Sequence, residues 1–127
     1  MKTVILGIVL SIVMTPVMAT TQAAEEALSN YRQLGVTSFD AQAGQQLWQQ
    51  DFDGRQCASC HGEDLTQNGK HVKTKKTLKP MAPSVNSGRF TKIKKIEKWF
   101  KRNCKWTLGR ECSPQEKGNM LAWLIEQ

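Results

Sequence analysis

Cys57, Cys60 and His61 form the pattern in this chain that most directly predicts a chemistry. Two cysteines three positions apart, followed directly by a histidine, are typical of a covalent c-type haem attachment site. At that spacing the two thiols can reach the two vinyl groups on one edge of a porphyrin, and the imidazole can bind the iron. The sequence therefore predicts one haem c, bound covalently through Cys57 and Cys60, with His61 as the proximal iron ligand.

Two other uses of a Cys-x-x-Cys pattern fit this chain less well. A structural zinc site needs four ligands, typically from two such pairs, and the sequence has one pair at this spacing. A redox-active dithiol would not need the histidine and would normally lie near a strand–helix pattern. Haem attachment is the interpretation that uses all three residues.

The first residues of the chain have the pattern of a secretory signal peptide. Lys2 precedes an apolar run over residues 4–17, and Ala19 provides a small residue for cleavage. We predict a signal peptide over residues 1–19, one soluble domain over residues 20–127, and export to the periplasm. An uncleaved anchor is the alternative. The run is short for a membrane span, and no later run is long enough for stable membrane insertion.

The other two cysteines, Cys104 and Cys112, lie eight positions apart. Leftover cysteines in an exported protein tend to pair with each other, so we expect a disulfide, with two free thiols as the alternative. A bond that closes so short a loop would contribute about 2–3 kcal/mol to stability by the chain-entropy relation.

Charge is distributed unevenly along the chain. Residues 20–69 hold seven acidic and two basic side chains, whereas residues 70–105 hold thirteen basic side chains and one acidic one, Glu97. Such a dense positive segment favours an acidic partner, because fields of this kind steer encounter. Nucleic acid is the rival ligand, but an exported protein seldom meets it. A basic face that interacts only with solvent explains the pattern equally well.

Helical periodicity and breaker residues predict an all-α domain. The expected order is an irregular N-terminus, a helix, the haem motif, a long loop, a basic amphipathic helix, a turn and a terminal helix. These segments are residues 20–36, 39–52, 57–61, 62–87, 90–103, 106–111 and 113–125. Ser38, Thr91 and Ser113 are the expected helix caps, and Ser113 is followed by Pro114 and Glu116, a strong helix start.

That order is the one expected of a small class I cytochrome c fold around one haem, here with a short disulfide-closed loop. The first and last helices of that fold cross at a close contact. Gly44 and Trp48 are expected to supply one side of it, against Trp123 or Leu124. All four tryptophans are interpreted as ordinary core residues.

The residue on the other side of the iron is less clearly specified by spacing. Electron-transfer cytochromes usually place methionine or histidine there, which makes Met81, Met120 and His71 the alternatives. Met81 comes early for a chain that must pass around the haem, and Met120 lies inside a helix. Asn103 stands near the usual position of a distal ligand, although asparagine at a helix end is more often a cap.

Several strings in the second half of the chain are more specific than the haem motif. They are Pro80-Met81-Ala82-Pro83-Ser84-Val85-Asn86, Arg89-Phe90-Thr91, Trp99-Phe100-Lys101-Arg102-Asn103-Cys104, Leu108-Gly109-Arg110-Glu111-Cys112 and Gln115-Glu116-Lys117-Gly118. Together with the haem motif they resemble the sphaeroides haem protein family, which has class I-like monohaem cytochromes ligated by asparagine. The match extends from about residue 39 to residue 124.

The resemblance implies that Asn103 is the distal iron ligand and that Cys104 and Cys112 form a disulfide beside it. It also implies that the asparagine leaves the iron on reduction, which opens a site for oxygen, nitric oxide or carbon monoxide. A dihaem cytochrome c is the electron donor that the resemblance implies.

The predicted function is therefore an exported monohaem cytochrome that takes part in electron transfer and binds a small gas. A plain electron carrier with methionine as the distal ligand is the alternative. A basic binding module with a structural haem is a third hypothesis. No acid–base pair in the sequence points to a particular reaction, so turnover as an oxidase or nitric oxide-processing enzyme stays open.

Overall fold

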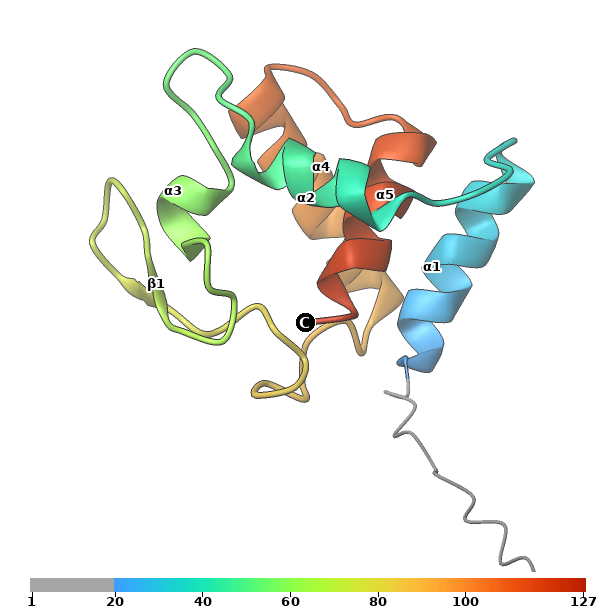
Figure 1. The fold of residues 1–127 in the computed structure, drawn as a ribbon, viewed down its shortest axis with the longest axis horizontal. Coiled ribbons are helices and arrows are strands. Elements are labelled where there is room, and N and C mark those ends of the chain that lie inside the picture. Colours follow the sequence, from blue (N-terminus) through green and yellow to red (C-terminus); the bar gives the residue numbers. More distant parts are fainter. Residues whose placement is uncertain (1–19) are drawn as a thin grey trace, which may run out of the picture.

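The computed structural model describes residues 20–127, and the predicted signal peptide lies outside the described residues. The described chain is mostly helical, as predicted, with one short antiparallel ribbon (Figure 1). Its elements are α1 (Gln22–Gln33), α2 (Ala41–Gln49), α3 (Ala58–His61), β1 (Gly69–Lys70), β2 (Thr77–Leu78), α4 (Ile93–Leu108) and α5 (Pro114–Leu124). None of these helices is long and apolar enough to cross a membrane.

Helix α1 corrects the prediction that residues 20–36 are irregular. Thr21 caps the helix, because its side chain accepts a hydrogen bond of 3.1 Å from the Ala24 amide. The helix then buries one face against α4 and α5. That face consists of Ala23, Ala24, Ala27, Leu28 and Tyr31. The pattern is easy to miss because three of these residues are alanines, whose small side chains give little hydrophobic contrast but favour helix and close packing.

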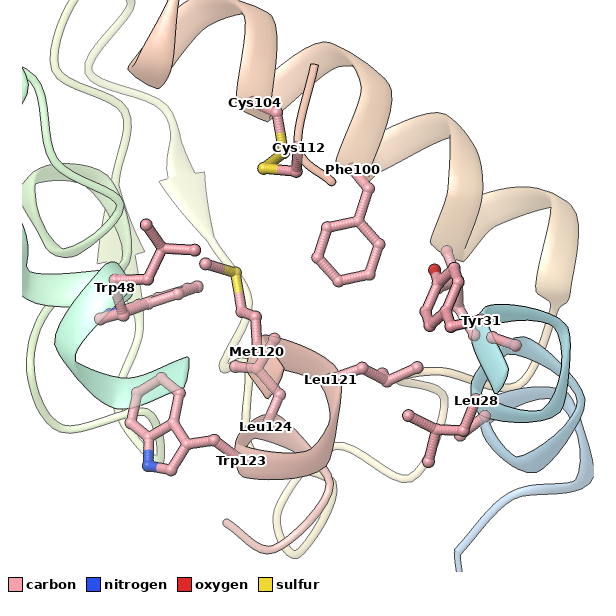
Figure 2. Close-up of a cluster of buried hydrophobic side chains, with 14 of the residues drawn as sticks. Leu28, Tyr31, Trp48, Phe100, Cys104, Cys112, Met120, Leu121, Trp123 and Leu124 are labelled. Carbon is pink, nitrogen blue, oxygen red and sulfur yellow. A yellow bond between two sulfur atoms is a disulfide. The ribbon is translucent and has the colours of Figure 1, made fainter. Parts of the chain in front are cut away.

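Helices α2 and α5 form the predicted close crossing. A side-chain carbon on Gly44 would lie only 2.2 Å from the Asn119 carbonyl oxygen and 2.9 Å from the Met120 Cα, so glycine is required there. The rings of Trp48 and Trp123 lie 5.6 Å apart along the same contact (Figure 2). The N-terminal cap of α2 is Asp40, which accepts a hydrogen bond from the Ala43 amide, and not Ser38.

Helix α4 is longer than predicted and begins differently. It starts at Ile93 with no side-chain cap, and Thr91 instead donates to the Gly88 carbonyl. It continues to Leu108 through the stretch predicted to be a turn. The chain leaves the helix at Gly109, which has a φ of 73°, a left-handed conformation that glycine adopts without strain.

The start of α5 is as predicted. Ser113 accepts a hydrogen bond from the Glu116 amide, and Glu116 accepts one from the Ser113 amide, which completes a capping box with Pro114 in the first turn. Arg110 pairs with the Glu116 carboxylate at 2.7 Å, and the two hydrogen bonds from Arg110 are the main reason that the pKa of Glu116 is lowered. The Arg110–Glu116 pair therefore holds the turn before α5 against the first helical turn of α5.

The disulfide between Cys104 and Cys112 is present, with their Cα atoms 5.5 Å apart. Both cysteines are buried, and Figure 2 shows the bond beside Phe100. The bond ties α4, at a position one turn before its last residue, to the residue before the cap of α5. The loop closed by this bond thus consists partly of helix, not only of the predicted turn.

Only two of the four tryptophans belong to the core. Trp48 and Trp123 are buried, whereas Trp99 is 48% exposed and Trp106 is 37% exposed. Trp99 and Trp106 instead line a large cavity together with Cys57, Cys60 and His61, so the prediction of ordinary core positions was wrong for these two. The core side of α4 is formed by Ile96, Phe100, Cys104 and Thr107, and the two exposed indoles lie outside that stripe.

Candidate haem site

The three residues of the haem motif lie on the single turn of α3. Cys57 precedes the turn, and Cys60 and His61 end it. Both cysteines are half-buried and free, and they are not bonded to each other. Gly62, with a φ of 80°, ends the turn and lets the chain leave directly after His61. A short helical turn thus presents the two thiols and the imidazole together.

The hairpin formed by β1 and β2 packs closely against this turn. Gly69 in β1 faces the backbone of α3, and a side-chain carbon on Gly69 would lie 2.3 Å from the Cys60 carbonyl oxygen. The same carbon would lie 2.8 Å from the Cα of His61. Gly69 is therefore a positioning residue for the haem motif. From the sequence, Gly69 was predicted only to be a loop residue, because its neighbouring residues do not show which backbone a glycine will approach.

We expect Gly69→Ala to displace His61 and weaken the haem site. Backbone atoms cannot move aside as a flexible side chain does, so the substitution should cost about 1–3 kcal/mol of stability. The measurements are the free energy of unfolding and the absorption spectrum of the exported protein. Gly88→Ala is the control for the free energy of unfolding, since the nearest atom to its added carbon is a side-chain oxygen at an ordinary 3.6 Å. Equal effects of the two substitutions would contradict this role of Gly69.

Trp48, on the helix that precedes the haem motif in the sequence, also supports the motif. Its indole Nε1–H donates a 3.1 Å hydrogen bond to the carbonyl of Gly62, and its ring lies 5.4 Å from the His61 ring. Trp48 also packs on Trp123, so the position of His61 depends on the α2–α5 crossing. The indole is therefore both a core residue, as predicted, and a positioning residue for the motif.

His61 has the protonation state that metal binding requires. Burial, followed by the positive charges of Arg89 and His71, lowers the pKa of His61 to about 4. The imidazole is thus neutral at neutral pH and keeps a nitrogen lone pair for a metal. Its buried Nδ1 has no hydrogen-bond partner within residues 20–127. A buried ring nitrogen without a hydrogen-bond partner costs free energy. A group that binds the imidazole ring can offset this cost.

A cavity of about 1010 Å³ opens in front of the motif. It reaches the upper end of the usual range for sites that hold cofactors. Cys57, Cys60 and His61 line it, together with residues of α4 and of the loop over 77–92. Burial raises the pKa of the Cys57 thiol to about 11, so this thiol is protonated at neutral pH. The thiols, the imidazole and the size of the cavity fit a covalently bound haem.

Asn103 lines the same cavity as His61, from α4. Its side chain has no hydrogen-bond partner within residues 20–127, and the neighbouring Cys104 is fixed by the disulfide. The structure thus brings Asn103 and the haem motif to one site from segments far apart in the sequence. Their assignment as distal and proximal ligands stays a prediction.

The three alternative ligands also line the cavity, in different states. Met120 is buried in the core, and its Cα belongs to the α2–α5 crossing. His71 accepts a 3.1 Å hydrogen bond from the Thr74 amide at Nδ1, which engages that ring nitrogen. Met81 is half-buried, so it remains the alternative to Asn103 as the distal iron ligand.

The fold and this cavity define a small, mostly helical c-type cytochrome. Residues 34–124 match the model of a family described as a domain of unknown function, DUF1924. The cytochrome c-type protein SHP of Cereibacter sphaeroides is 35% identical over 117 residues, which cover 88% of this chain and 90% of that protein. Cytochrome c'' of Methylophilus methylotrophus is 45% identical over 71 residues, which cover 56% of this chain and 49% of that protein.

Solved structures agree with these relatives. The structure of oxidised SHP, described as an oxygen-binding cytochrome c, has a TM-score of 0.78 and 34% identity, and covers 85% of this chain and all of that one. Oxidised cytochrome c'' from Methylophilus methylotrophus has a TM-score of 0.73 and 32% identity, covering 81% of this chain and 93% of that one. The chain belongs to the DUF1924 family and is an SHP-like cytochrome c with one covalently bound haem. The predicted family, fold class and cofactor are thereby confirmed.

Proposed function

We propose that this cytochrome is exported to the periplasm, accepts electrons and binds a diatomic gas at its reduced iron after Asn103 leaves. The observation that carries the proposal is the placement of Asn103 in the wall of the cavity that also holds His61 and both haem-attaching cysteines. Two relatives support it. One is described as an oxygen-binding cytochrome c, and the solution structure of cytochrome c'' is described as giving insight into haem-ligand detachment.

The roles of the side chains follow from their chemistry. Cys57 and Cys60 would hold the haem through thioether bonds, and His61 would bind its iron. When bound, the haem supplies an iron that changes oxidation state and can take a gas molecule. Asn103 offers a neutral amide oxygen, which is a hard and weak donor. Such an oxygen suits ferric iron better than the softer ferrous iron, so Asn103 should leave on reduction.

The disulfide restricts how far Asn103 can move. Cys104 follows Asn103 directly and is tied to Cys112, which precedes the capping box of α5. The disulfide therefore anchors the part of α4 that carries Asn103 to the start of α5. This arrangement favours a side-chain movement of Asn103 over an unwinding of the helix end. If reduction of the disulfide leaves gas affinity and spectra unchanged, the bond has no part in ligand release.

A methionine-ligated electron carrier is the second candidate function, and the position of Met81 in the cavity favours it. A thioether is a soft ligand that also binds ferrous iron well, and it would leave no site for a gas. In that protein Asn103 would be an ordinary residue of α4, five positions before its last residue, Leu108.

Absorption spectra of the holoprotein separate the two functions. The proposed function predicts a ferric spectrum without the weak far-red band of sulfur ligation. It predicts a five-coordinate, high-spin ferrous spectrum that changes when carbon monoxide is added. A stable six-coordinate, low-spin ferrous spectrum that carbon monoxide does not alter would reject gas binding and favour Met81.

A dihaem cytochrome c is the proposed electron donor, as in the family that the sequence resembles. Diatomic gases are the proposed ligands, and spectra with oxygen, nitric oxide and carbon monoxide compare their affinities. Comparison of the molecular mass of the exported holoprotein with that of the full chain tests whether residues 1–19 are removed.

A further inference from the structure

The segment that leads into α4 contains a residue with a strained backbone. Phe90 has a φ of 55°, in the left-handed region that a bulky aromatic residue rarely adopts. Its half-buried side chain packs against the core and lines the cavity that also holds Cys57, Cys60 and His61. Strain of this kind persists only where surrounding contacts maintain it, and it is concentrated at sites that hold ligands. Phe90 therefore needs a contact that keeps it in place.

A residue from the beginning of the described chain makes such a contact. The hydroxyl of Thr21 donates a hydrogen bond to the carbonyl oxygen of Phe90, 69 residues later in the sequence. The same hydroxyl oxygen accepts the Ala24 amide at 3.1 Å and so caps α1. A hydroxyl has one proton to donate and lone pairs with which to accept, so the two bonds use different parts of the group.

Helix α1 gives Thr21 a fixed position. The helix packs against α4 and α5, and near its other end the Tyr31 hydroxyl donates to the Glu97 carboxylate of α4. Among the residues that the structure describes, neither Thr21 nor any residue of α1 lines the haem cavity. Thr21 therefore reaches the haem site through Phe90 and not by direct contact.

The rest of segment 88–92 is held mainly from the opposite side. Arg89 donates to two carbonyl groups of the preceding loop, and Thr91 donates within the segment, to Gly88. Helix α4 then begins without a side-chain cap. The Thr21 hydroxyl is thus the hydrogen-bonding group that fixes this segment to α1.

We propose that Thr21 is a positioning residue of the haem site, whose hydroxyl holds Phe90 in the cavity wall and thereby restricts the entry of small neutral ligands to the iron. This role rests on the gas binding proposed above and names a residue that controls access to the same site. When the hydrogen bond opens, Phe90 can relax from its left-handed conformation, and its side chain can move out of the cavity wall.

Three substitutions separate the donated hydrogen bond from the capping of α1. Thr21→Asp keeps an oxygen that caps the helix, but an ionised carboxylate has no proton to donate to Phe90. Thr21→Ser keeps both functions. Glu26→Gly weakens α1 at an exposed position and leaves the Thr21 hydroxyl unchanged. A role that depends only on the stability of α1 would appear in Glu26→Gly and not in Thr21→Asp.

The first measurement is hydrogen exchange at the Arg89 amide of the holoprotein. This amide donates to the Asn86 carbonyl at 3.0 Å, so its exchange requires the segment to open. Thr21→Asp should speed the exchange about threefold to tenfold, the factor that corresponds to the loss of one neutral hydrogen bond. Thr21→Ser and Glu26→Gly should change it less than about twofold, as exposed or conservative substitutions usually do.

The second measurement is the association rate of carbon monoxide with the reduced holoprotein. Carbon monoxide is neutral, so the charge introduced by Thr21→Asp does not attract or repel it. The rate should rise in Thr21→Asp by about the same threefold to tenfold factor as the exchange, because both require the same opening. Thr21→Ser should restore the wild-type rate.

Equal exchange and association rates in Thr21→Asp and Thr21→Ser would overturn the proposal, because the hydroxyl would then only cap α1. An effect of Glu26→Gly as large as that of Thr21→Asp would also overturn it, and so would faster exchange with an unchanged carbon monoxide rate. If the reduced wild type binds no carbon monoxide, the proposed gas binding fails. The association rate of imidazole with the ferric protein then tests access in its place, so the two failures are distinguishable.

Discussion

Replacing Asn103 with methionine is expected to abolish carbon monoxide binding by the reduced protein at concentrations that saturate the wild type. A thioether at this position stays on ferrous iron, so a gas must displace it. If the open site is populated about 1% of the time or less, the apparent affinity falls about 100-fold or more. The measurement is a carbon monoxide titration of the reduced protein, followed by absorption.

The spectra of the same variant supply the reason for any loss. Asn103→Met should give a low-spin, six-coordinate ferrous spectrum, and its ferric form should gain the far-red sulfur band. Lys101→Met is the matched control, since it places the same side chain at an exposed position of α4 outside the cavity. The control should bind carbon monoxide as the wild type does. Unaltered binding in Asn103→Met itself would remove Asn103 from the distal site.

Replacing Gly44 with valine is expected to destabilise the protein by about 3 kcal/mol, the upper end of the usual cost of overpacking. The cause is the contact of the α2 backbone with the α5 backbone, where an added carbon would lie 2.2 Å from the Asn119 carbonyl oxygen. The helices must separate, and no rotamer change relieves the clash. The measurement is the free energy of unfolding from guanidinium denaturation of the holoprotein.

Gln45→Val is the control for this substitution. It puts the same β-branched side chain on the next, exposed residue of α2 and should cost about 0.5 kcal/mol from helix propensity alone. Gly44→Val should also alter the haem spectrum, because Trp48 on α2 holds the Gly62 carbonyl beside His61. A destabilisation no larger than that of Gln45→Val would show that α2 and α5 tolerate a wider crossing.

Features that depend on neighbouring residues were predictable from the sequence. The capping box at Ser113 and Glu116 needs only residues three positions apart, and the structure contains it. The disulfide joins residues within a short segment, so few alternative partners competed. The close crossing at Gly44 and Trp48 was also anticipated, because the first and last helices of the class I fold cross at a close contact. In the structure Trp48 packs on Trp123, as expected, and Gly44 meets the backbone at Asn119 and Met120.

Features decided by partners far along the chain were predicted less well. Helix α1 appeared irregular because its buried face is mostly alanine, whose burial becomes evident only when α4 and α5 cover it. Trp99 and Trp106 appeared to be core residues because tryptophan is usually buried. Their exposure follows from α4 turning its Ile96–Phe100–Cys104 stripe toward the core. Secondary-structure periodicity does not say which side of a helix faces a cavity.

By itself the sequence determined the chemistry available to this protein: two thiols and an imidazole spaced for one haem. It also determined the family, through strings that contain Asn103 and the disulfide cysteines. The tertiary structure decided where those groups meet, because α3 and α4 lie far apart in the sequence and line the same cavity. It also decided that Gly69 and Trp48 hold the haem motif in place. The spacing of the two thiols and the imidazole depends only on residues close together in the sequence. A cavity exists only after segments distant in the sequence have packed together.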